Sequence, residues 1–596
     1  MSVLETPRIY FKGEVAWDPI VTNNFDTNYD ETTGKTIYPS VVNRVKAFRE
    51  QAIEEPGNWN PHGTHRAVLY ETSVSGFDMG NGVNTDDPFV SAAVDFTAML
   101  VDLEPYGTIS SQLYFDAMRF GVDGGYRISA PRTSRVTARY INFARNSANK
   151  MIAGVASVVW QTSFAKTTGL RIDAFDSPLL QTLAGSIEQD DVLGLTVRFN
   201  TYRTIYYDNP DLTNGSLGAK AAAQALITKL KRGGFQPNPA RSMVVGVVGL
   251  WRKLEPAYEP GDRVLIPATD SPIGSAYARL AKTTLTLDLS NSVPEVDKNL
   301  TKKDLGVLNV VAVDSAGQVV LNLGSFGYGE YNRAAYEMSA GIVSIPLAPG
   351  IAQSAVDSDL HLRDAAGTPL LEEMAVRAIP ATPNLYLDEG EDVVTTFQAY
   401  IRGRLAASRV PVTLFQLGSG GTKLAEPRHL LTDSKGVLTL SLTKISEGIT
   451  AYVPSLSSVD QPVNGINPQV STYMYVRVRP GDAAVAALAP TWENVYSKVL
   501  ANWSAMAPCM DNWLKLDDPV QIKAYASVLK RLTDPAQFEN FSFMPVTRDL
   551  SAGERALLYN FLDSLDEGAL GKPKTQKPLG PNFVELSRAM RRGSKE

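Results

Sequence analysis

Short alternations of apolar and polar residues run along most of the chain up to about residue 480. They are clear in Arg8–Lys12, Arg135–Ile141 and Leu195–Phe199. A period of two residues is typical of strands with one buried and one solvated face, and the glycines and prolines between them suit the turns of antiparallel sheets. This pattern predicts β-sandwich layers, because the helical segments that βαβ units need are missing between the strands.

Two hairpins are predicted in the later β-rich part of the chain. Val307–Val313 and Gln318–Leu323 flank the polar segment Asp314–Gly317, whose final glycine suits a tight turn. The segment Thr432–Gly436 precedes the alternating strand Val437–Leu442, and this arrangement predicts a hairpin of an immunoglobulin-like sandwich.

Toward the C-terminus the period of the pattern changes to that of helices. Apolar residues in Trp492–Trp503 follow helical spacing, with Thr491 placed as the N-cap. A second helix is predicted over Pro519–Asp534, and a third begins with the capping box Ser551–Glu554.

The predicted fold is therefore mainly β, with antiparallel β-sandwich modules in series followed by a small α-helical domain. The predicted units are 1–267 (β-rich, with one helix at 219–232), 268–391 (β-rich), 392–482 (an immunoglobulin-like sandwich), 483–566 (helical) and 567–596 (a basic linker and tail).

The composition is that of a folded protein with few groups for metal or redox chemistry. The 596 residues carry 57 lysines and arginines against 63 aspartates and glutamates, a net charge of −6. Extended nucleic-acid surfaces need clustered cationic residues, so nucleic-acid binding is not expected. The single cysteine, Cys509, excludes an intramolecular disulfide and a cysteine-based zinc site. With four histidines in the chain, no metal site is predicted.

No targeting or membrane segment is visible in the sequence. The N-terminus lacks the basic and then apolar regions of a secretion signal. The longest apolar run, Met243–Trp251, is about half as long as a bilayer-crossing helix requires. We therefore expect a soluble, cytoplasmic protein without a membrane span.

Several segments of the chain, in order over about residues 1–565, are similar to one known family. They are Met1–Gly13, Asp190–Val197, Val244–Arg252, Asp359–Asp364 with Gly367 and Leu370–Leu371, Asn384–Leu387, Tyr400–Gly403 and Phe543–Ser551. On these segments the chain resembles the family of iminophenylpyruvate dimer synthases of violacein pathways and chromopyrrolate synthases of indolocarbazole pathways.

The resemblance implies the β-rich N-terminal region of that family. Its members are much longer, and their C-terminal part resembles a ferritin-like bundle, a fold that supplies metal ligands through Glu and Glu-x-x-His. No such motif occurs in the predicted helices, because Glu426–His429 contains a proline and lies in a β-rich stretch. The chain is therefore expected to lack the ferritin-like module.

Two functions of different class follow from this comparison. The first is a partner-dependent component of an oxidative secondary-metabolite enzyme system that dimerises amino-acid-derived imines, with a ferritin-like or redox protein as partner. The isolated chain is then not expected to be an autonomous redox enzyme or to hold a cofactor, and haem is implied only by the resemblance. The alternative is a non-catalytic binding or structural protein that reuses the β-rich scaffold in a homo- or hetero-oligomer.

Three residues are candidates for catalysis. His65 lies where the resemblance places a histidine, and imidazole suits haem ligation or proton transfer. The alternative is that His65, like the neighbouring His62, is a loop histidine bonded to nearby backbone. Asp190 and Asp191 precede a buried-looking strand, and paired carboxylates suit acid–base chemistry when burial separates their pKa values. The alternative is a solvated turn.

The C-terminal tail carries a predicted partner-docking segment. After the proline-rich linker at 571–581, apolar residues at helical spacing stand beside arginines. The residues are Phe583, Leu586, Met590, Arg588, Arg591 and Arg592. A short amphipathic helix of this kind suits docking on a partner, and the alternative is a frayed basic tail.

Overall fold

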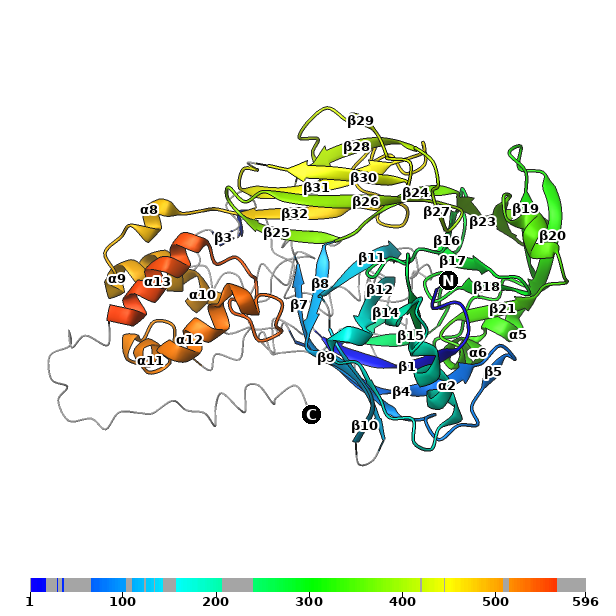
Figure 1. Ribbon diagram of the computed structural model, residues 1–596, viewed down its shortest axis with the longest axis horizontal. Coiled ribbons are helices and arrows are strands. Elements are labelled where there is room, and N and C mark those ends of the chain that lie inside the picture. The colour runs from blue at the N-terminus through cyan, green and yellow to red at the C-terminus, as the bar shows by residue number, and fades with distance from the viewer. Residues whose placement is uncertain are drawn as a thin grey trace.

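A computed structural model shows a mainly β protein, with several antiparallel sheets and a group of helices near the C-terminus (Figure 1). This confirms the predicted fold class. The structure describes residues 2–17, 29–30, 35–36, 66–102, 110–122, 125–132, 134–142, 157–205, 240–297, 299–418, 421–443, 445–506 and 514–564.

The first sheet closes on itself, because β1 pairs with both β15 and β4. The strands of this closed ring, in order of pairing, are β1 (Arg8–Trp17), β15 (Ala240–Arg252), β14 (Val192–Ile205), β12 (Ser157–Ala165), β11 (Val136–Asn142), β8 (Ser111–Phe115), β7 (Thr97–Asp102) and β4 (Arg66–Asp78). Further strands extend the sheet from β4; they are β5 (Val83–Asn84), β6 (Ala93–Asp95), β9 (Ala117–Val122), β10 (Gly125–Pro131) and β13 (Arg171–Ile172). A separate short pair is formed by β2 (Tyr29–Asp30) and β3 (Lys35–Thr36).

Both faces of β1 and β15 are buried, which explains the long apolar run in β15. Ile9 and Phe11 on β1 belong to the core cluster of the first sheet, whereas Tyr10 between them packs in a second cluster with Tyr277 and Ile342. Alternate residues of a strand point to opposite faces. The first sheet therefore uses one face for its own core and the other for its contact with the second sheet.

One helix covers the core of the first sheet. Helix α2 (Pro178–Ile187) begins at Ser177, whose side chain accepts a hydrogen bond from the Leu180 amide, and it buries Leu183. The short 3-10 segment η3 (Lys166–Thr168) precedes it. The helix predicted at 219–232 lies outside the described residues.

The second sheet contains the hairpin that the sequence predicts around Asp314. Asp314 accepts a hydrogen bond from the Gly317 amide, and Gly317 has a φ of 77°, so the turn needs its glycine. The strands in order of pairing are β20 (Val319–Phe326), β19 (Leu308–Val313), β22 (Asp359–Arg363), β23 (Pro369–Met374), β16 (Arg263–Pro267), β17 (Ala276–Leu280), β18 (Thr284–Asp288) and β21 (Ile342–Pro346). Its short helices are α5 (Tyr328–Tyr331), α6 (Arg333–Met338) and α7 (Ile351–Ala355).

Two further sheets face each other as a sandwich. One holds β24 (Val376–Pro380), β26 (Val393–Ile401), β27 (Arg404–Leu405) and β30 (Val437–Leu442). The other holds β25 (Asn384–Asp388), β32 (Met474–Arg479), β31 (Gly448–Ser455), β28 (Pro411–Leu417) and β29 (Arg428–Leu431), and its β25–β32 pair is parallel. A shared core, which includes Phe397 and Leu440 from one sheet and Leu414 and Val476 from the other, joins them.

The prediction of a hairpin around Thr432–Gly436 is wrong. The turn itself forms, because the Asp433 amide donates to the Val437 carbonyl. The strands on either side do not pair, since β29 pairs with β28 and β30 pairs with β26. The turn therefore connects the two layers of the sandwich. Alternation within a strand does not determine which sheet the strand joins.

The helical part confirms the predicted starts of its helices. The Thr491 side chain accepts from the Asn494 amide, the Asp518 side chain accepts from the Val520 amide, and Ser551 and Glu554 form the reciprocal capping box. The elements are α8 (Ala483–Ala486), α9 (Trp492–Val495), one π-helical turn η5 (Tyr496–Leu500), α10 (Ala501–Met506), α11 (Pro519–Ala524), α12 (Ala526–Thr533), the 3-10 turn η7 (Pro535–Gln537) and α13 (Ala552–Ser564).

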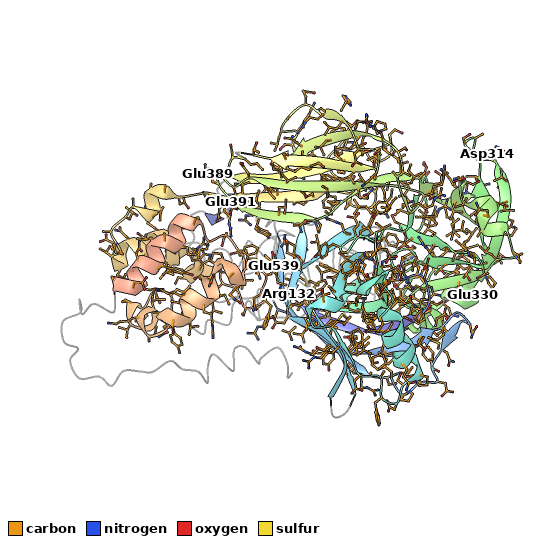
Figure 2. The ribbon with its side chains drawn as sticks, in the orientation of Figure 1. Arg132, Asp314, Glu330, Glu389, Glu391 and Glu539 are labelled. Carbon is orange, nitrogen blue, oxygen red and sulfur yellow. The ribbon has the colours of Figure 1, made fainter. Side chains whose placement is uncertain are left out.

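The helical part contacts the first sheet through charged and aromatic side chains. Arg135 at the start of β11 forms an ion pair with Glu539. Figure 2 shows Glu539 and Arg132 where the helices meet the first sheet. The chain passes from the first sheet to the second between β15 and β16 and leaves the second sheet between β23 and β24. From β24 to β32 it moves back and forth between the two sheets of the sandwich. The predicted unit boundaries remain predictions.

Candidate functional site

A pocket of about 370 Å³ lies where the first sheet, the second sheet and the sandwich meet. We call it the junction pocket. Its walls come from N-terminal residues, β12, β14, the end of β15, β17 and the β26–β27 turn. Its charged lining residues are Asp191, Arg198, Arg252, Lys253, Glu255, Arg279 and Arg404. Its apolar and aromatic lining residues include Val3, Leu254, Pro256, Tyr400 and Leu405.

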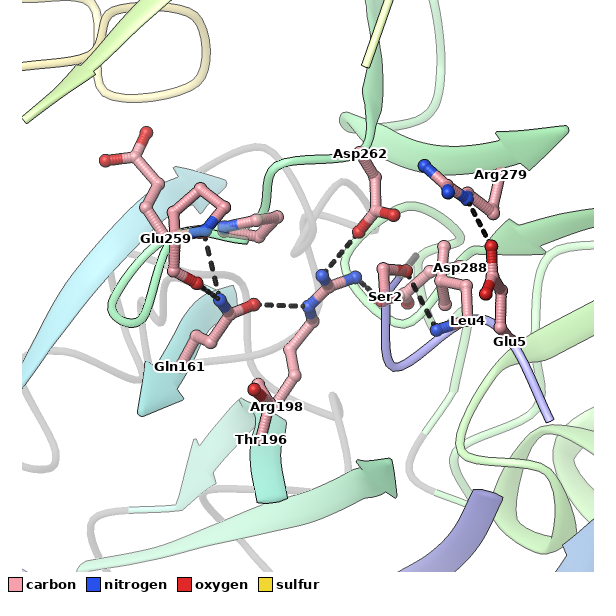
Figure 3. Close-up of polar contacts among 12 residues, drawn as sticks. Ser2, Leu4, Glu5, Gln161, Thr196, Arg198, Glu259, Asp262, Arg279 and Asp288 are labelled. Atoms are coloured by element: carbon pink, nitrogen blue, oxygen red, sulfur yellow. Dashed lines mark hydrogen bonds and ion pairs between the residues drawn. The ribbon is translucent and has the colours of Figure 1, made fainter. Parts of the chain in front are cut away.

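Arg198 is the buried cation of the junction pocket. It comes from β14, and its guanidinium lies 2.5 Å from Asp262 and 3.3 Å from Asp288 (Figure 3). Its Nε donates to Gln161 at 3.0 Å, and its guanidinium lies 4.9 Å from the ring centroid of Tyr277. Burial is the largest single effect and would raise the pKa of Asp262. The charges of Arg198 and Arg279 and the hydrogen bonds from Ser2 and Arg198 together outweigh it, so the pKa of that carboxyl is lowered. The positive charge of Arg198 is thus balanced by two buried carboxylates, and these ion pairs connect β14 to the second sheet.

Three arginines at the rim of the junction pocket each have one carboxylate partner. Arg252 lies 2.6 Å from Asp191. The other two pairs are Arg279 with Glu5 at 2.8 Å and Arg404 with Asp357 at 2.6 Å. A guanidinium carries five N–H donors, so one carboxylate does not exhaust its capacity for anions. Five cationic side chains line the pocket against two carboxyl groups.

A tight turn after β15 places Glu255 in the pocket wall. Leu254 in this turn has a φ of 74° and is 73% exposed, and the Glu255 amide donates to the Arg252 carbonyl. The Glu255 carboxylate accepts from the Arg252 amide at 2.9 Å. Burial raises the pKa of Glu255 to about 7, against the lowering effect of that hydrogen bond. A strongly shifted carboxyl in a cleft with cationic neighbours marks a candidate functional residue.

Of the predicted aspartates, Asp191 lines the junction pocket and Asp190 does not. Asp191 precedes β14, whose first residue Val192 pairs with Arg252, and this register brings Asp191 to Arg252. The hydrogen bond from Arg252 lowers the pKa of Asp191. Asp190 is exposed. The two residues do not share a buried environment, and a catalytic role for either remains a prediction.

The other predicted site residues lie outside the described residues. These are His65, Phe583, Leu586, Arg588, Met590, Arg591 and Arg592. His62 and Cys509 also lie outside them.

The described histidines lie away from the junction pocket. His361 on β22 is 3.4 Å from Arg363, and His429 on β29 is 3.3 Å from Thr413. Neither of them lines the pocket, so the described residues there do not offer a histidine for haem. Within the described ranges, no group of three or more histidine, cysteine, aspartate or glutamate residues is placed to hold a metal ion. No helix in the described part of the chain has the length and apolarity to cross a membrane.

Four of the segments that carry the family resemblance meet at this pocket. Met1–Gly13 contributes Ser2 and Val3, and Asp190–Val197 contributes Asp191 and Thr196. Val244–Arg252 contributes Arg252, and Tyr400–Gly403 contributes both of its end residues. The segments Asp359–Asp364, Asn384–Leu387 and Phe543–Ser551 do not line it. Segments separated by up to about 400 residues are therefore brought together at one cavity.

Sequence reasoning missed most of the charged groups of the junction pocket. Glu255, Arg279 and Arg404 stand in no motif, and Arg198 directly follows a resemblance segment without being part of it. The available signal was the arginine that ends the resemblance segment Val244–Arg252. The register of β14 against β15 was needed to place it beside Asp191.

Comparisons with known proteins give one distant relative and no matching family model. The 2-imino-3-(indol-3-yl)propanoate dimerase of Chromobacterium violaceum is 23% identical over 437 residues, which are 69% of this chain. The chain is distantly similar to this dimerase. The match covers 37% of the dimerase's own length. This similarity supports a link to a dimerase of the violacein pathway and leaves the family of the chain unassigned.

Solved structures match only parts of this chain, with low TM-scores. The D0–D1 domain of intimin matches 33% of this chain at 12% identity with a TM-score of 0.14. The two tandem V-type regions of a chitin-binding protein, VCBP3, match 33% of the chain at 10% identity with a TM-score of 0.13. Similarities of this size support no conclusion about the fold.

Proposed function

We propose that the chain is a component of an oxidative secondary-metabolite enzyme system that dimerises amino-acid-derived imines, and that its junction pocket binds the carboxylate of a small acid. One observation carries the proposal: four resemblance segments meet at a single cation-rich cavity. The name of the distant relative describes a propanoate, which is a carboxylate anion.

The chemistry of the pocket suits such an acid. Guanidinium groups pair with carboxylates in a planar, two-point geometry, and Arg252 and Arg279 present such groups at the rim. Leu254, Pro256 and Tyr400 offer apolar surface for the organic side chain of the ligand. A volume of about 370 Å³ falls within the size of small-molecule sites, roughly 300–1,000 Å³. We therefore place the acid with its carboxylate toward the rim arginines.

We propose further that the oxidising group comes from a partner, a ferritin-like or redox protein. The residues that line the junction pocket are ion-pairing and apolar, and they suit binding more than electron transfer. The proposed docking segment is the tail that includes Phe583, Leu586 and Met590. The test is size-exclusion chromatography of the full chain with a ferritin-like protein encoded beside it, compared with a chain that lacks 571–596. Equal complex formation by both chains would contradict docking through the tail.

Ligand binding is tested by calorimetry on the full chain with freshly prepared indole-3-pyruvate, a 2-oxo analogue of an imino acid that has no imine to hydrolyse. We expect binding in the micromolar to millimolar range, and an affinity about tenfold or more weaker after Arg279→Ala, since hydrogen bonds to charged groups contribute about 1.5–3 kcal/mol. Arg333→Ala is the matched control, because Arg333 is an exposed arginine with a glutamate partner outside the pocket. Absence of binding, or equal loss in both variants, would contradict the proposed site.

A second candidate function, assembly without catalysis, is favoured by one edge of the second sheet. Strand β20 lies at the end of the sheet order, and its Val319 and Val320 are 48% and 54% exposed. Apolar edge strands pair readily with other chains. Light scattering over a concentration series tests this alternative. Assembly that Val320→Lys abolishes would support it, and a monomer at all concentrations would contradict it.

A further inference from the structure

Glu255 occupies a constrained position between the cationic groups of the junction pocket. Its carboxylate accepts from the Arg252 amide at 2.9 Å, and its carbonyl accepts from the Trp251 indole at 3.1 Å. Both ends of the residue are therefore bonded to β15, which holds the carboxyl in the pocket wall next to Arg252 and Lys253. An anion that entered the pocket would be held close to this carboxyl.

The groups that face Glu255 come from each element around it. Asp262 acts on it as a like charge, and Arg279 acts as an opposite charge. Tyr400 lies in the same environment as Glu255. Burial is the main cause that raises the pKa of the Tyr400 hydroxyl, and the charge of Glu255 also raises it. The other charged lining residues are Asp191, Arg198, Arg252, Lys253 and Arg404. The ionisation of Glu255 therefore depends on all of these charges together, and a bound anion would add one more negative charge beside it.

Near neutral pH this carboxyl is close to half ionised, since its pKa is about 7. A second negative charge within a few ångströms disfavours the ionised form. At a slightly alkaline pH part of the molecules therefore carry an ionised Glu255, and an anion bound beside this carboxyl shifts them toward the protonated form.

We propose that Glu255 takes up a proton from solvent when an anion binds in the junction pocket, so that the pocket binds an acid as anion plus proton. The proposal rests on the proposed function, because it assigns a role to a residue of the same pocket. The only covalent change is the new O–H bond on Glu255, and the proton comes from the buffer. Its consequence is that the pocket binds the acid more tightly below neutral pH, without a change in the rim arginines.

Calorimetry in two buffers tests the proposal. The full chain is titrated with indole-3-pyruvate at pH 7.5 in imidazole and in Tris, two cationic buffers whose different ionisation heats reveal the protons exchanged on binding. We expect an uptake of about 0.3–0.7 proton per ligand and none for Glu255→Gln. Asp191→Asn is the matched control: it also removes a carboxylate from the pocket, but one whose pKa is lowered, so uptake should persist.

The outcomes separate this proposal from the proposed function. Binding without proton uptake in the wild-type chain overturns the role of Glu255 and leaves the anion site intact. Uptake that persists in Glu255→Gln also overturns the role of Glu255, because another group then takes up the proton. Absence of binding overturns the anion site and the proton coupling with it. A wild-type titration from pH 5.5 to 9 needs no variant: uptake should peak just above the pKa of Glu255 and vanish at both ends.

Discussion

The Arg548 guanidinium lies 3.4 Å from the centroid of the Tyr114 ring, and this contact joins the helical part to the first sheet. Arg548 is fully buried, and it donates hydrogen bonds to the carbonyls of Val546 at 2.7 Å and Asn540 at 2.9 Å. No carboxylate forms an ion pair with it among the described residues. Burial lowers the pKa of Arg548, and the ring and carbonyl dipoles compensate its charge.

Arg548→Met should loosen the helical part without unfolding the sheets. It removes the cation–π contact and leaves the backbone carbonyls of Phe538, Asn540 and Val546 without their donor, and the expected loss is about 3 kcal/mol. Limited proteolysis should then cleave near residue 540 faster than in wild type. Lys530→Met is the control, because its pair with Asp563 is exposed and should contribute about 0–1 kcal/mol. Equal cleavage of both variants would contradict this role.

Arg198→Met should strongly destabilise the contact between the first and second sheets. It leaves Asp262 and Asp288 buried without their partner, and breaking a buried ion pair costs about 3–5 kcal/mol. Unfolding in urea, followed by intrinsic fluorescence, measures the loss. The double variant Arg198→Met, Asp262→Leu should recover part of it, because it removes one unpaired carboxylate. A single variant as stable as wild type would contradict the assignment.

Glu255→Gln should stabilise the protein above neutral pH. The pKa of Glu255 rises from its ordinary 4.5 to about 7 on folding, so between these values the folded state binds a proton that the unfolded state does not. The stabilisation of the folded state by this proton is fully present below about pH 4.5 and is lost as the pH rises to 7. Above pH 7 the variant should be more stable by about 2 kcal/mol, and by little near pH 4.5.

Urea unfolding at pH 5 and pH 8 measures this difference, and the fluorescence of Trp251 reports it locally, because the indole donates to the Glu255 carbonyl. Asp191→Asn should show the opposite direction, since its lowered pKa favours the folded state above its ordinary range. A stability gain of the Glu255 variant that is equal at both pH values would argue against the raised pKa.

Ser551→Ala should weaken the start of α13. Ser551 is buried, and it exchanges hydrogen bonds with Glu554. These two bonds satisfy the backbone amides of both residues at the N-terminus of the helix. The expected loss is about 1 kcal/mol, visible as a lower urea midpoint of the helical part. Thr491→Ala removes the corresponding cap of α9 at an exposed site and should cost less.

Local patterns predicted the elements that depend on neighbouring residues. The alternation at Arg8–Lys12 became β1, the turn at Asp314–Gly317 formed, and the caps at Thr491 and Ser551 lie where they were expected. The hairpin at Thr432–Gly436 failed because period-two alternation is the same whichever sheet a strand joins. Partner choice depends on the packing of side chains between sheets.

The sequence by itself determined a mainly β chain with a helical C-terminal part, and it marked the segments that resemble one family. Only the tertiary structure decided that the first sheet closes through the β1–β4 pairing and that four of those segments meet at one pocket. It also decided the protonation of Glu255, because the pKa of this residue is raised by burial among residues that are far apart in the chain. The physical reason is that charge and burial act through space, whereas the periods of strands and helices act along the chain.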